Sequence, residues 1–335
     1  MFSQPLVKVL SAEPYEYLGA MFKPDVIALG EPMVEFCATD TGRLSVVDVF
    51  KRGWGGDTSN FAVAAARVGA KAAHLCSLGD DEFGRSFMGL WASEGMDTSR
   101  VVVEPGAWTA IYVISLVEGG GHDFTYYRAG SAASRYRVTD LDEEYVASAR
   151  VLHTSGISMA VSVSLREAAF MAMELCRDAG GEVTLDVNMR AKLWPVDTAR
   201  KVLGRAFTKA DTVFASMEDV RTLYGVTEPR EAAAHLSDMG VETVVIKHGG
   251  EGCHVSAGGE SLTCPGFDVR VVDTTGSGDA FDGAWVAATL EGWSLERKAA
   301  FANAVGALTA TGLGAVAPIP TREQALRLME EQGRW

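Results

Sequence analysis

Short apolar runs alternate with longer amphipathic segments along most of the chain after residue 24. The apolar runs cover 25–36, 72–79, 151–156, 182–188, 212–216 and 242–249. Segments with apolar residues at helical spacing lie between them, at 58–70, 81–95, 165–181, 198–210 and 230–240. Strands that alternate with helices of this length are typical of βαβ units. The pattern therefore predicts an α/β fold in which helices cover both faces of a mainly parallel sheet.

Two segments interrupt this alternation, because 37–56 and 109–131 each look like strand pairs joined by polar or glycine-rich turns. We expect the strands at about 37–53 and 109–130 to form a small β-sheet lid within a single domain over 24–335. The exposed edges of such strands favour pairing with a second subunit. We therefore expect a homodimer or a higher homo-oligomer formed through the lid. Residues 1–23 lack the features of a signal peptide and are expected to be an N-terminal extension.

The charge and composition exclude several classes of protein. The chain has 335 residues, of which 47% are hydrophobic, and a formal net charge of −14. A nucleic-acid partner needs a surplus of Lys and Arg, so we expect none. No apolar run approaches the roughly 18 residues of a membrane span, so we expect no membrane partner. The five cysteines form no C-x-x-C motif. They are expected to be reduced, buried thiols of a cytoplasmic protein.

The stretch VVDTTGSGDAFDGAWVAATL, residues 271–290, predicts an apolar strand, a glycine-rich turn and a helix. Such a turn binds phosphate, because backbone N–H groups converge at the positive end of the helix. Gly276, Ser277 and Gly278 form the turn, and Asp279 follows directly. Aspartate is also a favoured N-cap residue, so capping is an alternative for Asp279. If an anion takes the amide donors instead, the carboxylate is free to accept a proton.

A second glycine-rich turn, GWGGDTSNFAVAAARVGA at 53–70, precedes an alanine-rich helix. Together, the two motifs resemble the signatures of the PfkB, or ribokinase-like, carbohydrate kinases, and the resemblance runs from about residue 24 to 325. It implies a ribokinase-like three-layer sandwich with a small β lid, and phosphorylation of a sugar hydroxyl by ATP with Mg²⁺. It also implies that Asp279 is the catalytic base. The N–H groups of Gly276, Ser277 and Gly278 would then hold the γ-phosphate.

Two arginines suggest an acidic substrate. Arg128 follows Tyr126 and Tyr127 in an expected lid strand, and Arg190 follows the strand at 182–188, at the edge where parallel sheets bind ligands. A guanidinium matches a carboxylate in a bidentate fashion, which a neutral sugar does not need. The alternative for Arg128 is a surface residue on an aromatic-rich strand.

The segments GWGGDTSN, YYRAGSAAS, SGIS and DVNMRAKLW look like those of the 2-keto-3-deoxygluconate kinases within the family. That resemblance implies phosphorylation to 2-keto-3-deoxy-6-phosphogluconate. The sugar contacts that it implies are Gly56, Asp57, Asn60, Tyr112, Tyr126, Arg128 and Arg190. 5-Dehydro-2-deoxygluconate is the next candidate substrate. Fructokinase and ribokinase activities rank lower, because they leave the two arginines unexplained.

By the same resemblance, the nucleotide lies along 244–255 and near the helix at 300–315. Its expected contacts are Ser216, Lys247, Gly249, Gly252, Asn303 and Gly314. A solvated strand-end residue is the alternative for Lys247. Many relatives carry Asn-x-x-Glu where this chain has Ser216 and Asp219. This difference leaves Asp219 as a candidate Mg²⁺ ligand through water only. Asp273 and Thr275 match one side of a monovalent cation site, so K⁺ is a further candidate.

Two other classes of protein remain as alternatives. The first is a PfkB-like protein that binds a sugar or a partner without catalysis; the altered Ser216 and Asp219 favour it, and the intact turn at 276–279 argues against it. The second is a dehydrogenase. No G-x-G-x-x-G motif follows the first strand, which argues against a dinucleotide site.

Overall fold

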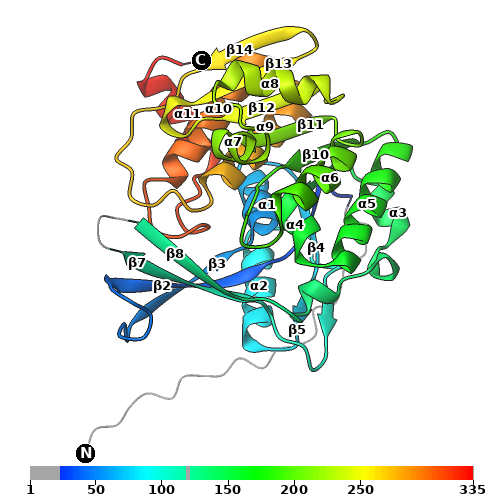
Figure 1. Cartoon of the computed structure of the whole chain (residues 1–335), viewed down its shortest axis with the longest axis vertical. Coiled ribbons are helices and arrows are strands. Elements are labelled where there is room, and N and C mark those ends of the chain that lie inside the picture. Colours follow the sequence, from blue (N-terminus) through cyan, green and yellow to red (C-terminus); the bar gives the residue numbers. More distant parts are fainter. Residues whose placement is uncertain (1–22, 118–120, 335) are drawn as a thin grey trace, which may run out of the picture.

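An eight-stranded sheet forms the centre of the computed structural model, which describes residues 23–117 and 121–334 (Figure 1). The N-terminal extension expected over 1–23 lies outside the described residues, apart from Lys23. From edge to edge the strands are β14 (Glu260–Cys264), β13 (Cys253–Ala257), β12 (Thr243–Lys247), β11 (Thr212–Ser216), β10 (Glu182–Asp186), β9 (Val151–Ser155), β1 (Val26–Leu29) and β4 (Ala72–Leu75). Pairing is parallel from β4 to β12, and β13 and β14 add an antiparallel hairpin at one edge.

Helices cover both faces of this sheet. One face packs against α1 (Asp57–Arg67), α2 (Glu82–Ser93), α9 (Ser277–Leu290), α10 (Leu295–Thr309) and α11 (Arg322–Glu331). The other packs against α3 (Glu143–Ala147), α4 (Gly156–Val161), α5 (Val163–Asp178), α6 (Val196–Phe207), α7 (Met217–Tyr224) and α8 (Pro229–Asp238). Within β1, Val26 and Ala28 join the first core while Ile27 and Leu29 join the second. A strand buried on both faces is apolar throughout, and the α/β fold expected from the alternation is confirmed.

Two of the expected strands are divided in the structure. The run at 25–36 gives β1 and then β2 (Met33–Thr41), which belong to different sheets. Gly30, Glu31 and Pro32 separate them, and Pro32 has no N–H to continue a ladder. The run at 72–79 likewise gives β4 and β5 (Ser77–Gly79), and β5 pairs with β6 (Val102–Glu104) in a two-stranded parallel sheet.

A second, four-stranded sheet lies beside the main sheet, at the lower left of Figure 1. Its order is β3 (Phe50–Gly55), β2, β7 (Ile111–Val117) and β8 (Gly121–Tyr127). The hairpins β2–β3 and β7–β8 are antiparallel, whereas β2 and β7 run parallel. We call these four strands the small sheet. They are the two inserted strand pairs expected from the sequence.

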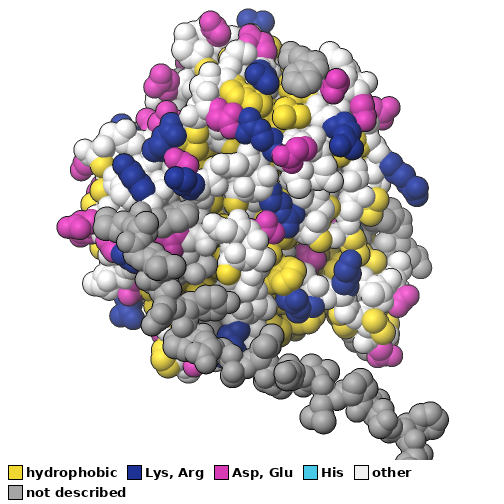
Figure 2. Space-filling view, turned by 180° about the vertical axis from the view of Figure 1, so that it is seen from behind, with side chains coloured by type: hydrophobic (Ala, Val, Ile, Leu, Met, Phe, Trp, Pro, Cys, Tyr) yellow, Lys and Arg dark blue, Asp and Glu magenta, His cyan; other side chains and the backbone are white. Residues whose placement is uncertain are grey.

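On the face shown in Figure 2, basic and acidic side chains are interspersed rather than gathered by sign. None of the helices within residues 23–117 and 121–334 is long and apolar enough to cross a bilayer.

Candidate active site

Several predicted site residues lie at the carboxyl edge of the parallel strands, together with Asp186, which the sequence analysis did not single out. Asp186, Ser216 and Lys247 end β10, β11 and β12, respectively. The first residues of α1 and α9 meet at the same edge, because the amide of Asn60 contacts the carboxylate of Asp279. Open α/β sheets bind their ligands at this edge.

The turn that begins α9 is built around Gly276. This residue is the N-cap of the helix and has a φ of 78°, and a Cβ there would lie 2.6 Å from the carbonyl oxygen of Ala315. Since Gly276 is the N-cap, the capping alternative for Asp279 is wrong. The N–H of Ser277 donates to the oxygen of Thr274 at 3.2 Å. The amides of Gly276 and Gly278 have no partner among the described residues.

The hydroxyl of Ser277 is buried and has no hydrogen-bond partner within the described parts of the chain. A buried polar group without a partner is costly. An anion at the helix N-terminus would accept a hydrogen bond from this hydroxyl as well as from the free amides. The turn therefore fits a phosphate group.

Asp279 lies in the first turn of α9 with its carboxylate toward α1. The side-chain amide of Asn60 donates to its Oδ2 at 2.8 Å. The pKa of Asp279 is raised to about 7. Burial is the largest cause and the carboxylates of Asp57 and Asp186 add to it, whereas Asn60 and Lys247 oppose the rise. A carboxyl group with a pKa near neutrality is suited to accept a proton.

Asp57 and Gly56 begin α1. Gly56 has a φ of 95°, and a Cβ there would lie 2.3 Å from the carbonyl oxygen of Glu31, so the turn requires glycine. The buried carboxylate of Asp57 accepts hydrogen bonds from the Thr58 amide at 2.9 Å and from the side chain of Asn188 at 3.0 Å. Asn188 has a φ of 35°, which aims the loop after β10 back toward α1.

The two arginines differ in their surroundings. Arg128 is buried and forms an ion pair with the fully buried Glu31, which also accepts a hydrogen bond of 3.1 Å from the Ser131 hydroxyl. Arg190 is exposed. Burial raises the pKa of Asp57 and of Asp219, and the charge of Arg190 opposes the rise in both. No described carboxylate is within ion-pair distance of Arg190. Of the two arginines, only Arg190 lacks an ion-pair partner among the described residues.

Tyr112 and Tyr126, two of the expected sugar contacts, lie opposite each other in the small sheet, with ring centroids 6.2 Å apart. The hydroxyl of the buried Tyr112 donates to Glu35 at 2.6 Å. Burial raises the pKa of Glu35 to about 7, although this hydrogen bond opposes the rise. The ring centroid of Tyr126 lies 6.2 Å from those of both Tyr112 and Phe124, and Tyr126 is only partly buried. Tyr126 is therefore the more accessible of the two.

Lys247 is paired with two carboxylates of the protein, which the sequence did not predict. Its Nζ donates to Asp186 at 3.0 Å and to both carboxylate oxygens of Asp282 at 2.9 and 3.0 Å. Although burial opposes the charge, the two carboxylates raise the pKa of Lys247 above its ordinary value. The alternative of a solvated strand-end lysine is wrong.

The remaining expected nucleotide contacts lie in loops, except for Asn303, which lies in α10. Gly249 and Gly252, with φ of 55° and 98°, shape the connection from β12 to β13. Asn303 is buried and donates to the carbonyl oxygens of Cys264 at 3.2 Å and Pro265 at 3.4 Å. The N–H of Gly314 donates to Asp273 at 2.9 Å. These bonds position the loops, and nucleotide binding by these residues stays a prediction.

The candidate metal ligands already accept hydrogen bonds. Asp219 accepts from the N–H and hydroxyl of Ser216, both at 2.7 Å, and from the N–H of Met189 at 2.7 Å. It completes a capping box at the start of α7. Asp273 accepts from the N–H and hydroxyl of Thr275 at 3.0 and 2.7 Å.

Within the described residues, no three acidic, His or Cys side chains are grouped as a metal site. Mg²⁺ usually keeps several waters and binds substrate phosphates with one or two carboxylates. Binding of a magnesium ion that is held mainly by nucleotide phosphates therefore stays a prediction.

Sequence reasoning missed Glu31, Glu35, Asn188 and Asp282. The clearest signal was available for Asp282, which is an acidic residue within a nine-residue buried run of α9. Glu31 and Glu35 similarly interrupt the apolar run at 25–36. A carboxylate in such a run requires a partner, but the sequence does not name it.

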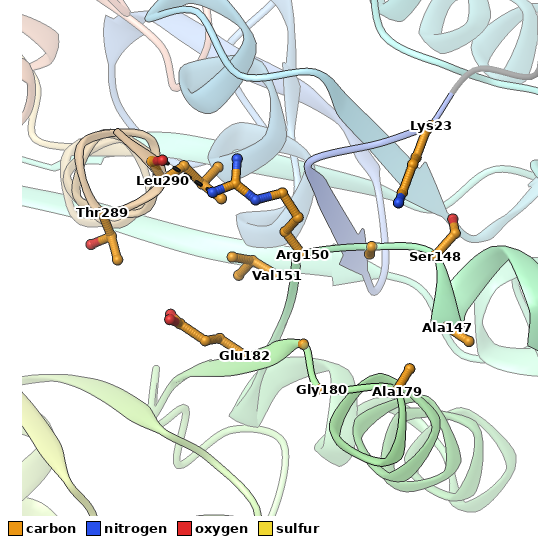
Figure 3. Close-up of a pocket in the computed structure, with 12 residues that line it drawn as sticks. Lys23, Ala147, Ser148, Arg150, Val151, Ala179, Gly180, Glu182, Thr289 and Leu290 are labelled. Carbon is orange, nitrogen blue, oxygen red and sulfur yellow. Dashed lines mark hydrogen bonds between the residues drawn. The ribbon is translucent and has the colours of Figure 1, made fainter. Parts of the chain in front are cut away.

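A hollow of about 350 Å³ lies at the opposite edge of the sheet (Figure 3). Lys23, Arg150 and Glu182 contribute its charged side chains, and Arg150 donates to the carbonyl oxygen of Leu290 at 3.1 Å. Since Val151 and Glu182 begin β9 and β10, the hollow is at the amino ends of the strands. It is separate from the candidate active site.

Known proteins resemble the chain over nearly its whole length. A family model described as pfkB family carbohydrate kinase matches residues 23–322. The 2-dehydro-3-deoxygluconokinase of Thermoproteus tenax is 35% identical over 309 residues, covering 91% of this chain and 94% of that protein. Fructokinase-1 of Oryza sativa subsp. japonica is 34% identical over 315 residues, covering 91% of this chain and 97% of that protein.

Solved structures agree with this result. A 2-dehydro-3-deoxygluconokinase from Thermotoga maritima matches with a TM-score of 0.84 and 26% identity, covering 91% of this chain and 99% of that chain. A fructokinase with bound ATP from Xylella fastidiosa matches with a TM-score of 0.83 and 26% identity, covering 92% and 99%, respectively. The chain thus has the ribokinase-like fold expected from its sequence and belongs to the pfkB family of carbohydrate kinases.

Proposed function

We propose that this protein transfers the γ-phosphoryl group of ATP to the terminal hydroxyl of an acidic keto-sugar. The proposed substrate is 2-keto-3-deoxygluconate, and the product is then 2-keto-3-deoxy-6-phosphogluconate. The observation that carries the proposal is the position of Asp279 in the first turn of α9, beside free amides and the buried hydroxyl of Ser277. One turn of helix thus combines a proton acceptor with donors for a phosphate.

In the proposed reaction, the sugar oxygen bonds to the γ-phosphorus while the bond from phosphorus to the ADP oxygen breaks. Asp279 accepts the proton of the sugar hydroxyl, and Asn60 holds the carboxylate in place. The amides of Gly276 and Gly278 and the positive end of α9 stabilise the charge on the phosphoryl oxygens. Mg²⁺ on the ATP phosphates supplies further neutralisation of that charge.

Arg190 supports an acidic substrate. Its guanidinium follows β10 at the carboxyl edge and has no described carboxylate within ion-pair distance. A sugar carboxylate would supply the missing partner through two charge-assisted hydrogen bonds. Tyr126 and Arg128 approach from the small sheet, which we propose acts as a lid that excludes water. The relative from Thermoproteus tenax carries the name of this activity.

Fructose is the second candidate substrate, and the ion pair of Arg128 with Glu31 favours it. That pair leaves one unbalanced arginine rather than two, so the argument for an acidic sugar then depends on Arg190 alone. Fructokinase-1 of Oryza sativa is 34% identical to this chain, almost the same as the 35% of the 2-dehydro-3-deoxygluconokinase of Thermoproteus tenax.

A coupled ADP-release assay with ATP and Mg²⁺ tests the proposal against 2-keto-3-deoxygluconate, 5-dehydro-2-deoxygluconate, fructose, ribose and adenosine. We expect the highest kcat/KM for 2-keto-3-deoxygluconate. A preference for fructose would keep the kinase and reject the acidic substrate. No turnover with any of the five would instead favour a protein that binds without catalysis.

Three further expectations stay predictions. Dependence of kcat on K⁺ rather than on a bulky organic cation would support a cation beside Asp273 and Thr275. Light scattering would measure whether the protein is a dimer or a higher oligomer. Such an assembly is expected if the free edges of the small sheet, β3 and β8, pair with a second subunit. Fractionation of cells would test the cytoplasmic location.

A further inference from the structure

Lys247 lies between two buried carboxylates directly behind the phosphate-binding turn. Its side chain is 13% exposed, while those of Asp186 and Asp282 are 5% and 0% exposed. A Cβ added to Gly278 would lie 3.3 Å from the Nζ of Lys247. The ammonium is therefore packed against the same turn that carries Asp279.

The three partners come from three separate elements. Lys247 ends β12, and Asp186 ends β10, which is two strands away. Asp282 projects from α9 one turn after Asp279. The geometry therefore couples the end of the sheet to the first two turns of this helix.

The charges around Asp279 are strongly unbalanced without this lysine. The largest electrostatic effects on its carboxylate come from Asp57 and Asn60 of α1, Asp186 of β10 and Lys247 of β12, and the phenol of Tyr112 in β7 also interacts with it. Lys247 is the one cation among them. Charges that are close together and shielded from water interact strongly, so the ammonium of Lys247 favours an ionised Asp279.

We propose that Lys247 is a positioning residue for phosphoryl transfer: held by Asp186 and Asp282 against Gly278, its ammonium supplies the positive charge that allows Asp279 to ionise as the base. This inference rests on the proposed kinase function, in which Asp279 accepts the sugar proton. It differs from the direct nucleotide contact that the sequence suggested for Lys247, because the ammonium acts here through the protein's own carboxylates.

The cluster allows a charge-balanced test. Lys247→Met removes the cation and leaves Asp186 and Asp282 facing each other. Lys247→Met combined with Asp186→Asn removes one positive and one negative charge, so the net charge of the cluster returns to its original value. Asp186→Asn alone removes only a negative charge. Lys247→Met should therefore raise the titration midpoint of Asp279, and Asp186→Asn alone should lower it. The double variant should return the midpoint to its original value.

The first measurement is a ¹³C NMR titration of the aspartate carboxyl carbons, with Asp279→Asn used to assign the signal of Asp279. We expect Lys247→Met to raise the titration midpoint of Asp279 by at least about one pH unit. We expect the double variant to restore the midpoint and Asp186→Asn to lower it. An unchanged midpoint in Lys247→Met, or a double variant that behaves like the single one, would overturn the inference.

Lys247→Arg keeps the charge and covers the case in which Lys247→Met fails to fold. It should titrate like the original protein, and Asp186→Asn should still show its downward shift. The same two variants would expose a purely structural role, which changes stability without moving the titration of Asp279.

The pH profile of kcat/KM gives the second measurement. Its acid limb should move with the NMR midpoint in each variant, and a limb that stays in place would reject the catalytic part of the inference. The titration needs neither sugar nor nucleotide. A protein that titrates as expected but phosphorylates no sugar would therefore reject the proposed function and not the coupling of Lys247 to Asp279.

Discussion

The side-chain amide of Asn60 donates a 2.8 Å hydrogen bond to the carboxylate of Asp279, across 219 positions of sequence. This bond joins the first turn of α1, which carries the proposed sugar contacts, to the first turn of α9, which carries the proposed phosphate contacts. Both glycine-rich motifs therefore contribute to one site. Asn60 orients the oxygen that would accept the proton and also favours its ionised form.

Asp279→Asn should lower kcat by about 10²–10⁴-fold, because an amide cannot accept the proton of the sugar hydroxyl. The coupled ADP-release assay measures this, and circular dichroism checks that the fold is retained. Asp238→Asn, at an exposed position that ends α8, is the matched control and should retain full activity. A variant at position 279 that keeps most of its kcat would show that another group is the base.

The activity of the unmodified protein should rise with pH through about 7, because the pKa of Asp279 is raised to about 7 and only the ionised form is a base. Asn60→Ala removes a hydrogen bond that lowers this pKa. The acid limb of its kcat/KM profile should therefore move to higher pH. A profile that falls between pH 6 and 8, or a limb in Asn60→Ala that moves to lower pH, would contradict this account.

Asp279→Asn should also stabilise the protein at pH 8. The folded pKa of Asp279 is near 7 and its ordinary value is 3.8, so the folded state retains a proton that the unfolded state has already lost between these values. The free energy of unfolding consequently falls as pH rises from about 4 to about 7. The Asp279→Asn variant does not lose this stability, because asparagine does not ionise. Urea unfolding of both proteins at pH 4 and pH 8 checks the sign. An advantage of the variant that shrinks with increasing pH would refute it.

Arg190→Ala should raise KM for 2-keto-3-deoxygluconate by about 10- to 100-fold, the value of a charge-assisted hydrogen bond of about 1.5–3 kcal/mol. KM for ATP should change little, and kinetics with fructose should be nearly unaffected. Arg177→Ala, which removes a guanidinium at the end of α5, is the control. Equal increases for both sugars would mean that Arg190 does not bind a carboxylate.

Asp219→Ala should lower the free energy of unfolding by about 2–3 kcal/mol, because three donors of Ser216 and Met189 lose their acceptor. Glu218→Ala, at the exposed neighbouring position, should change it little. Urea unfolding measures both. The dependence of kcat on the Mg²⁺ concentration tests the other expected role of Asp219. A shift to higher Mg²⁺ in Asp219→Ala would support Asp219 as a metal ligand through water, and no shift would reject that role.

Local sequence patterns were sufficient to predict the fold class and the glycine-rich turn at the start of α9. Alternating apolar and amphipathic segments determine which strands can be buried on both faces, as β1 is. Gly276 and Gly56 are recognisable because their positive φ values exclude most other residues. The Gly276–Asp279 motif thus reflects local backbone geometry. It can be recognised without knowing which residues pack against it in the folded protein.

The partners of the charged side chains were decided only by the tertiary structure. Arg128 is balanced by Glu31 and Lys247 by Asp186 and Asp282, because strand order and helix packing bring together residues from distant segments. A carboxylate or an ammonium has the same sequence pattern whether it faces a substrate or another residue. By itself, the sequence identified the turn and Asp279 as the proposed proton acceptor, and the packing of β10, β12 and α9 determined which charges surround them.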